Sequence, residues 1–250
     1  MLDLVDITKR FNAGTPDEST VFDNFNFKVN AGEFVSVIGS NGSGKTTFIK
    51  LMCRLYDVTD GEILINGVNI KDYTKDSIIK LYSVVFQDFK IFSVSLKDNI
   101  CANSDFEGDR FYTCLENADI KERTEHMPNK ENTYLYKDLD ENGVEISGGE
   151  AQKLALARAL YKDAPIVVLD EPTAALDPIA ENEIYTRFNT FVQGKTAIYI
   201  SHRLSSCAFC DKIAVFNNAK LAETGTHKDL LSAGGKYAEL WNAQAKYYIQ

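Results

Sequence analysis

The segment GSNGSGKT, residues 39–46, has glycines, a lysine and a threonine at the spacing of a phosphate-binding loop. It follows an apolar stretch typical of a strand and opens one typical of a helix, which is the context that this motif requires. Glycines let successive backbone N–H groups converge on a phosphate. Lys45 would place a charge near the β- and γ-phosphates, and the Thr46 hydroxyl could bind Mg²⁺. The sequence therefore predicts a nucleotide site rather than an ordinary glycine-rich turn.

Four polar side chains follow other predicted strands. Asp170 ends the apolar run IVVLD, where it could hold Mg²⁺ through water, and Glu171 next to it could polarise an attacking water. Gln87, in VVFQD, can offer its amide oxygen to Mg²⁺ or to a water. His202, after TAIYIS, could bond the γ-phosphate. Acids, amides and single histidines are also common at strand ends. These four side chains are therefore functional candidates only because the phosphate-binding loop is present in the same chain.

The stretch EISGGEAQKLALARAL begins at Glu145 and places a Ser-Gly-Gly turn before a run of strong helix formers. Free N–H groups and the helix dipole suit such a turn to an anion. The turn has no lysine of its own, and Glu150 puts an acid in it. A plain helix cap would explain the local pattern but not the other motifs beside it.

These residues need an α/β scaffold, which the pattern of the chain predicts. Strands are expected in residues 2–38 and at GEILING and YSVVF, and apolar runs of β-branched residues at PIVVLD and KTAIYIS suit buried parallel strands. A helix is expected over GKTTFIKLMCRLY and a helical lobe over about 90–160. We expect one domain over 1–250, a P-loop NTPase core with a mixed, mostly parallel sheet, an antiparallel β lobe and the helical lobe.

The C-terminal part predicts a hairpin around Asn217 and Asn218 and a last helix with Tyr237, Leu240 and Trp241 on one side. His126 and His227 are expected at the surface.

Composition excludes several classes of protein. A formal charge of −9 disfavours nucleic acid as a partner. Five cysteines without regular spacing favour a reducing compartment, and Cys207 and Cys210 are expected to be small buried residues on a helix face rather than a redox or zinc site. No apolar run approaches the roughly 18 residues of a membrane span, and no signal peptide is visible, so the chain itself is expected to be soluble.

Five motifs in order, GSNGSGKT, VFQD, ISGGEAQKLALARAL, IVVLDEPTAALD and ISHRLS, resemble the nucleotide-binding domain of ABC transporters over nearly the whole chain. The resemblance implies ATP and Mg²⁺ as ligands and ATP hydrolysis as the activity. It implies that Phe11 stacks on adenine, where the family usually has Tyr. It assigns the general-base position to Glu171, the switch position to His202 and the inter-subunit position to Asp177.

The resemblance also implies a partner, a second copy of the domain in an ATP-dependent head-to-tail dimer. In this family the Ser-Gly-Gly turn of one domain closes over the ATP held by the other. Ser147 would therefore need no lysine of its own, because Lys45 of the opposite chain neutralises the phosphate. Glu150 departs from the more usual Gln. The expected ATP contacts are Phe11, Gly39, Ser40, Asn41, Gly42, Ser43, Gly44, Lys45, Thr46, Thr47, Ser147, Gly148, Gly149, Glu150 and Asp177.

Two further stretches, VVFQDFKIFSVSLKDNI and AETGTHKDLLSAGGKYAELWNAQ, resemble exporter-type half-transporters, in which a membrane-spanning domain precedes this one in the same chain. The implied function is the ATPase motor of an exporter at the cytoplasmic face of the cell membrane. A stand-alone soluble ABC ATPase is the alternative. A non-hydrolysing, ATP-gated interaction module is a third possibility, against which intact Glu171 and His202 argue.

Overall fold

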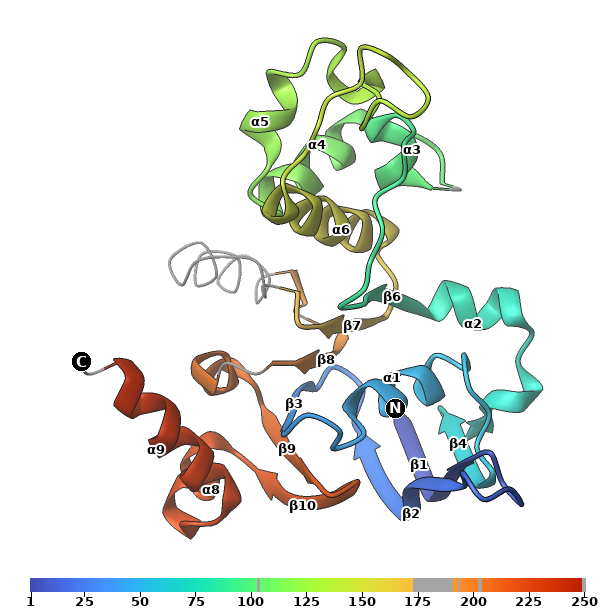
Figure 1. Cartoon of the computed structure of the whole chain (residues 1–250), viewed down its shortest axis with the longest axis vertical. Helices are drawn as coiled ribbons and strands as arrows, with labels where there is room; N and C mark the ends of the chain where they lie inside the picture. Colours follow the sequence, from blue (N-terminus) through green and yellow to red (C-terminus); the bar gives the residue numbers. More distant parts are fainter. Residues whose placement is uncertain (103, 173–190, 193, 202–203, 249–250) are drawn as a thin grey trace. The chain divides into compact units, whose positions relative to one another are not determined.

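The structure is a computed structural model that describes residues 1–102, 104–172, 191–192, 194–201 and 204–248 (Figure 1). The chain divides into two compact units. The first, the core unit, comprises Met1–Tyr82, Pro165–Asp170 and Gly194–Gln250. The second, the helical unit, comprises Ser83–Ala164 and Glu171–Gln193.

The core unit contains an antiparallel sheet of order β2-β1-β4-β5. Its strands are β1 (Leu2–Phe11), β2 (Ser19–Val29), β4 (Asp60–Ile65) and β5 (Val68–Asn69). Alternate residues of β2 are buried, as Phe25, Phe27 and Val29 show. This alternation is typical of a sheet with one face on the core and one in water. The predicted antiparallel β lobe is thereby confirmed.

A second sheet carries the parallel strands of the core unit, in the order β10-β9-β3-β8-β7. Its strands are β3 (Phe34–Gly39), β7 (Ile166–Asp170), β8 (Thr196–Ile200), β9 (Lys212–Asn217) and β10 (Lys220–Gly225). Strand β3 pairs in parallel with β8 and β9, and β7 with β8, whereas β9 and β10 are antiparallel. All residues of β7 and β8 are buried, which explains their uninterrupted apolar sequences. The predicted mixed, mostly parallel sheet is confirmed.

Helix α1 (Lys45–Met52) buries Phe48, Leu51 and Met52, as its spacing predicts. The helix ends one turn earlier than predicted, and Leu55 is 57 % exposed. Arg54 takes a left-handed conformation, and its guanidinium donates to the carbonyls of Ile70 and Tyr73 at 3.0 and 2.5 Å. With Arg54 left-handed, the backbone N–H groups of Leu55 and Tyr56 donate to the Lys50 oxygen at 2.8 and 3.1 Å, which closes the end of the helix.

An aromatic cluster fixes α1 against both sheets. The Phe48 ring lies 5.5 Å from that of Phe27 on β2 and 5.3 Å from that of Phe216 on β9. Phe25, also on β2, lies 5.3 Å from Phe216. Edge-to-face packing of this kind adds to the burial of large apolar rings. The start of α1, and with it the phosphate-binding loop, is therefore anchored from several strands.

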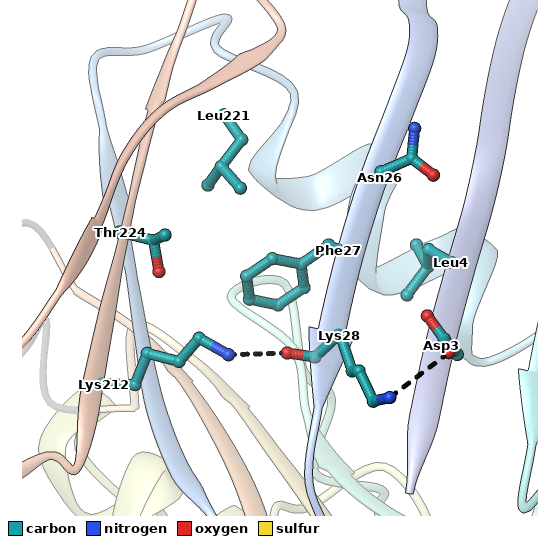
Figure 2. A pocket seen from close by; sticks show the side chains of 8 residues that line it. All are labelled: Asp3, Leu4, Asn26, Phe27, Lys28, Lys212, Leu221 and Thr224. Carbon is teal, nitrogen blue, oxygen red and sulfur yellow. Dashed lines mark hydrogen bonds and ion pairs between the residues drawn. The ribbon is translucent and has the colours of Figure 1, made fainter.

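A pocket of about 260 Å³ opens where β2 and β10 approach each other (Figure 2). Lys212 crosses it, donating to the backbone oxygen of Lys28 at 2.7 Å with its ammonium 5.3 Å from the Phe27 ring centroid. None of the predicted site residues lines this pocket. Its lining residues are Asp3, Leu4, Asn26, Phe27, Lys28, Lys212, Leu221 and Thr224.

The C-terminal elements follow the sequence pattern closely. Asn218 and Ala219 both have positive φ, as the tight β9–β10 hairpin requires. In α9 (Lys236–Tyr248), Tyr237 belongs to a buried cluster that includes Cys207 and Leu230, and Leu240 and Trp241 pack against that cluster. The predicted apolar side of this helix is therefore confirmed.

Two predictions in this region are wrong in part. His227, which begins α8 (His227–Ala233), is half-buried rather than a surface residue. Its Nδ1 lies 2.6 Å from the Tyr237 hydroxyl and its ring 4.5 Å from that of Trp241. Cys207 is buried, but Cys210 is only half-buried and follows the short 3₁₀ helix η3 (Leu204–Phe209) instead of sharing its face.

The helical unit holds the helices coloured green to olive in Figure 1. They are α3 (Leu96–Cys101), α4 (Gly108–Asn117), α5 (Lys121–Glu125), η2 (Lys130–Asn132) and α6 (Gly148–Lys162). Helix α6 packs on α3 and α4, burying Leu154, Phe111 and Leu115 among others. The predicted helical lobe is thereby described, while its boundaries at about 90 and 160 stay a prediction.

The remaining elements are η1 (Ile70–Asp72), α2 (Lys75–Leu81) and β6 (Tyr82–Val85). The first segment of the core unit ends at Tyr82, and the helical unit begins at Ser83. No helix in the described part of the chain is both long and apolar enough to cross a membrane.

Candidate nucleotide site

The loop between β3 and α1 carries the predicted phosphate-binding residues. Gly44 is the N-cap of α1 with φ of 96°, and the first turn of the helix holds no acid. At Gly39 a Cβ atom would lie 2.3 Å from the Phe216 oxygen and 2.6 Å from Ser43 Oγ. Glycine is therefore needed at the start of the loop for packing on β9 and at its end for the turn into the helix.

Lys45 lies inside this loop. It is 7 % exposed, and its Nζ donates to the backbone oxygens of Gly39 and Ser40 at 2.7 and 3.0 Å. The buried Ser43 Oγ has no hydrogen-bond partner among the described residues. An ammonium and an unpaired hydroxyl in one loop, beside the start of a helix, fit the oxygens of a phosphate. Lys45 and Ser43 therefore suit the phosphates of a nucleoside triphosphate.

Three residues predicted to hold Mg²⁺ lie on different elements. Thr46 is exposed in the first turn of α1, and Asp170 is buried at the end of β7, with 3 % exposure. Gln87 is exposed and belongs to the helical unit. Hydroxyl, carboxylate and amide oxygens are the donors that Mg²⁺ prefers. No cluster of three or more His, Cys, Asp or Glu able to hold a metal occurs in the part of the chain that the structure describes.

Glu171 opens the second segment of the helical unit with φ of 52°, a left-handed conformation uncommon for a residue other than glycine. Gln87 Nε2 donates to its Oε2 at 3.2 Å, and Gln152 Nε2, from α6, donates to its backbone oxygen at 3.0 Å. The Glu171 side chain is thus held from within the helical unit. Since Gln87 uses its amide nitrogen here, its amide oxygen is left for a cation or a water.

Gln152 is a residue that the sequence analysis missed. It is 4 % exposed, and nothing in its local sequence separates it from an ordinary helix residue. The sequence gives one cue, which is that Gln152 lies five residues after Ser147, in the helix that follows the Ser-Gly-Gly turn.

Phe11 ends β1 in the core unit and is half-buried. Its ring meets that of Tyr56 edge-on, with centroids 5.4 Å apart, and Lys9 Nζ lies 4.9 Å from its centroid. Phe11 is therefore only partly covered by its neighbours, and part of its ring is available to an aromatic ligand.

The Ser-Gly-Gly turn begins α6 with a complete capping box. Ser147 Oγ accepts from the Glu150 backbone N–H at 3.2 Å, and Glu150 Oε2 accepts from the Ser147 N–H at 2.7 Å. Ser147 and Gly148 are exposed, and a Cβ added at Gly148 would meet nothing within 4 Å. No neighbour in the described chain requires a glycine there, which leaves room for close approach from outside.

The Glu150 carboxylate is not free beside this turn. Arg123 Nε donates to its Oε1 at 2.7 Å. Burial raises the pKa of Glu150, but the hydrogen bonds from the Ser147 backbone, the Arg123 guanidinium and the Ser147 hydroxyl outweigh burial, and the net pKa is lowered. Arg123 is the second residue that the sequence analysis missed. The residues KERTE indicate only an exposed, charged helix.

Two predicted site residues, Asp177 and His202, lie outside the described residues. The remaining ones are those of the loop, at 39–47, the metal-ligand candidates, Glu171, Phe11 and the turn at 147–150. Loop, Phe11 and Asp170 belong to the core unit, and Gln87, Glu171 and the turn to the helical unit.

Comparisons with known proteins agree on one family. A family profile described as "ABC transporter" matches residues 22–174. "ABC transporter B family member 6" of Dictyostelium discoideum is 40 % identical over 225 residues, which are 90 % of this chain and 33 % of that protein. An "ATP-dependent lipid A-core flippase" of Idiomarina loihiensis is 39 % identical over 230 residues, or 91 % of this chain and 39 % of the flippase.

A solved structure described as a bacterial Atm1-family ABC exporter with ATP bound superposes with a TM-score of 0.89. It is 33 % identical and covers 98 % of this chain, which spans 42 % of that exporter. The chain thus spans about a third to two fifths of the length of the relatives that it matches.

Proposed function

This chain belongs to the ABC transporter family, and on that premise we propose that it is the ATP-hydrolysing motor domain of an exporter. The family's ATPase domain implies ATP as the nucleotide. The proposal adds Mg²⁺, a head-to-tail dimer and a transport step to that family assignment. The similarity of this chain to part of a longer ATP-dependent flippase and to part of an exporter described with ATP bound supports it.

The proposed reaction is the transfer of the γ-phosphoryl group of ATP to water. Lys45 and the loop amides bind the β- and γ-phosphates and offset the charge that develops there. Thr46, Asp170 and Gln87 would hold Mg²⁺, which supplies further charge neutralisation when bound. Glu171 accepts a proton from the water whose oxygen attacks phosphorus. The bond between the γ-phosphorus and the bridging oxygen breaks, leaving ADP and phosphate.

The placement of Glu171 is the observation that carries hydrolysis, as opposed to nucleotide binding alone. Its carboxylate is held by Gln87 and its backbone by Gln152, in a left-handed conformation that costs roughly 1 kcal/mol or more. Backbone strain that neighbours maintain is typical of residues with a defined task. A carboxylate held in this way next to the end of β7 supports the role of proton acceptor.

The proposed partner is a second copy of the domain. The Ser147–Glu150 turn, which is exposed at Ser147 and Gly148, would close over the nucleotide held by the other copy, and Asp177 would lie at the interface. His202 would contact the γ-phosphate, and Phe11 the adenine. ATP would then be part of the interface, and hydrolysis would release it.

The exporter assignment concerns the rest of the protein. We propose that a membrane-spanning domain, in the same full-length chain, accounts for the additional length of the relatives. The domain would then act at the cytoplasmic face of the cell membrane. A net charge of −9 gives no support to nucleic acid as a partner.

Lys45→Ala tests the nucleotide site. We expect ATP turnover to fall about a hundredfold or more, since a charge aimed at the transferred phosphate is lost. Lys80→Ala is the matched control, because it removes an exposed lysine of α2 in the same unit. Turnover in a phosphate-release assay, with circular dichroism to verify folding, separates the two. Normal turnover in folded Lys45→Ala would refute the assignment of the loop.

A further inference from the structure

Two ion pairs connect the segment 119–123 to the first turns of α6 in the helical unit. Arg123 Nε lies 2.7 Å from Glu150 Oε1, and Lys153 Nζ lies 2.7 Å from Asp119 Oδ2. The two pairs have opposite orientation, because the base is on α5 in the first and on α6 in the second. Their side chains are 20–42 % exposed, so water screens the pairs only in part. Together they join the segment 119–123 to the first turns of α6.

The first of these pairs acts on the turn that would meet a neighbour's nucleotide. Both oxygens of Glu150 are occupied, one by Arg123 and the other by the Ser147 backbone N–H. The carboxylate is therefore held within the turn and is close to the amides that would face a polyphosphate. Its negative charge opposes the binding of an anion at that place.

Arg123 brings the compensating charge. Its side chain is 42 % exposed, and Nε makes its one hydrogen bond with a described residue, the bond to Glu150. The two terminal nitrogens have no partner among the described residues. The guanidinium therefore offsets the charge of Glu150 and keeps N–H groups that no described residue uses.

We propose that Arg123 is a positioning residue for the nucleotide of the opposing copy: it neutralises Glu150, so that a carboxylate can stand in the Ser147–Glu150 turn without repelling the polyphosphate. This inference rests on the proposed function, in which the turn closes over a neighbour's ATP. Taken together, the Arg123 and Glu150 side chains carry no net charge, as a single neutral side chain at position 150 would. Arg123 acts through Glu150 and through the local charge.

A purely structural role for Arg123 makes a different prediction. If the ion pair only held α5 on α6, loss of either partner would weaken the turn, and loss of both would weaken it at least as much. If the pair balances charge, loss of both partners restores neutrality. The double substitution therefore distinguishes the two roles.

The test measures ATP-driven dimerisation in a Glu171→Gln parent, which should retain ATP. Arg123→Gln, Glu150→Gln and the double variant are added to this parent, and the dimerisation constants are obtained by sedimentation equilibrium at low and high salt. Lys121→Gln is the matched control. It removes a lysine from the same helix α5 that pairs with Glu116, 2.9 Å away, and not with Glu150.

The expected order follows the net charge of the turn. Arg123→Gln should weaken the dimer about threefold to tenfold and Glu150→Gln should strengthen it by a similar factor, as one unit charge several Å from the phosphates implies. The double variant and Lys121→Gln should match the parent within about twofold. All differences should shrink at high salt, because screening shortens the reach of a charge.

Two results would overturn the inference while the parent dimerises. One is an Arg123→Gln variant with the parent's dimerisation constant. The other is a double variant as weak as Arg123→Gln, with no effect of salt, which would assign Arg123 a structural role. A parent that stays monomeric with ATP would instead overturn the proposed function, and the inference with it.

Discussion

Glu171 shows what one residue's surroundings add to a motif. The sequence IVVLDEP predicts a carboxylate at a strand end, and the phosphate-binding loop gives that carboxylate a meaning. Its bonds to Gln87 and Gln152 could not be predicted, because these partners lie 84 and 19 positions away in the chain. Its φ of 52° could not be predicted from the motif either. Local sequence identifies a catalytic candidate, and the residues that hold it come from the tertiary structure.

The same limit applies to Glu150. From the sequence, the acid beside an anion-binding turn was a conflict between a favourable helix dipole and a repelled phosphate. The structure shows a third electrostatic interaction, with the Arg123 guanidinium, whose Nε lies 2.7 Å from Glu150 Oε1. No short-range pattern links α5 to the start of α6, so this compensation could be found only in the folded chain.

Phe11 gives a prediction at this scale. Phe11→Ala should weaken ATP binding by about 1–3 kcal/mol, the usual worth of stacking a base on an aromatic ring, whereas Phe11→Tyr should bind ATP nearly as well as the parent. Inorganic tripolyphosphate, which has no base, should bind equally to all three proteins. Isothermal titration provides the affinities. An ATP affinity unchanged in Phe11→Ala would show that the ring does not contact adenine.

At the scale of elements, most of the fold could be predicted from periodicity. Continuous apolar runs at 166–170 and 196–200 became buried parallel strands, and the alternation in residues 19–29 became a half-buried antiparallel strand. The end of α1 could not be predicted. The apolar spacing continues to Leu55, but Arg54 is left-handed and ends the helix first, and its side chain bonds to Ile70 and Tyr73, which are distant in the sequence.

The prediction that His227 lies at the surface was wrong for a comparable reason. A single histidine in a polar stretch is typical of the surface, but Tyr237 and Trp241 on α9 contact the His227 side chain. These partners are 10 and 14 residues away, and the packing of α8 against α9 places them.

The capping box of α6 leads to a prediction on pH. The pKa of Glu150 is lowered in the folded chain, so its charged form stabilises the fold above the ordinary pKa of 4.5. That stabilisation is lost as the pH falls through the lowered pKa. Glu150→Gln should therefore reduce the free energy of unfolding by about 0.5–1 kcal/mol at pH 7, and the difference should vanish in acid.

Urea unfolding at several pH values between 7 and 3 measures this difference. Glu145→Gln is the control, since it removes an exposed acid just before the same turn. A difference between parent and Glu150→Gln that stays constant with pH would show that the charge of Glu150 does not stabilise α6.

At the scale of the whole molecule, the ordered motifs identify the family and the structure distributes them over two units. The phosphate-binding loop belongs to the core unit, and the proposed base and the Ser147–Glu150 turn belong to the helical unit. In the proposed dimer the turn serves the partner's nucleotide, so neither copy has a complete site alone. The sequence predicted a helical lobe over about 90–160 that contains the turn, but it did not assign Gln87 or Glu171 to that lobe. The partners of Glu171 and Glu150 likewise required the fold.

Gly148 offers a way to separate the dimer from the fold. A Cβ at this position meets nothing within 4 Å, so Gly148→Val should leave the stability of the single chain within about 1 kcal/mol. In the proposed dimer the same side chain would stand where the neighbour's phosphates approach the turn. Combined with Glu171→Gln, Gly148→Val should therefore prevent ATP-driven dimerisation while ATP still binds to each monomer.

The mass of the Glu171→Gln protein in solution, with and without ATP and in the absence of Mg²⁺, tests the central claim most directly. Removing the proposed base retains ATP, and it also removes a negative charge from the site. Sedimentation equilibrium should give a monomer without nucleotide and a dimer with ATP, which reverts to monomer when Gly148→Val is added. A Glu171→Gln protein that binds ATP and stays monomeric at every ATP concentration would contradict the account.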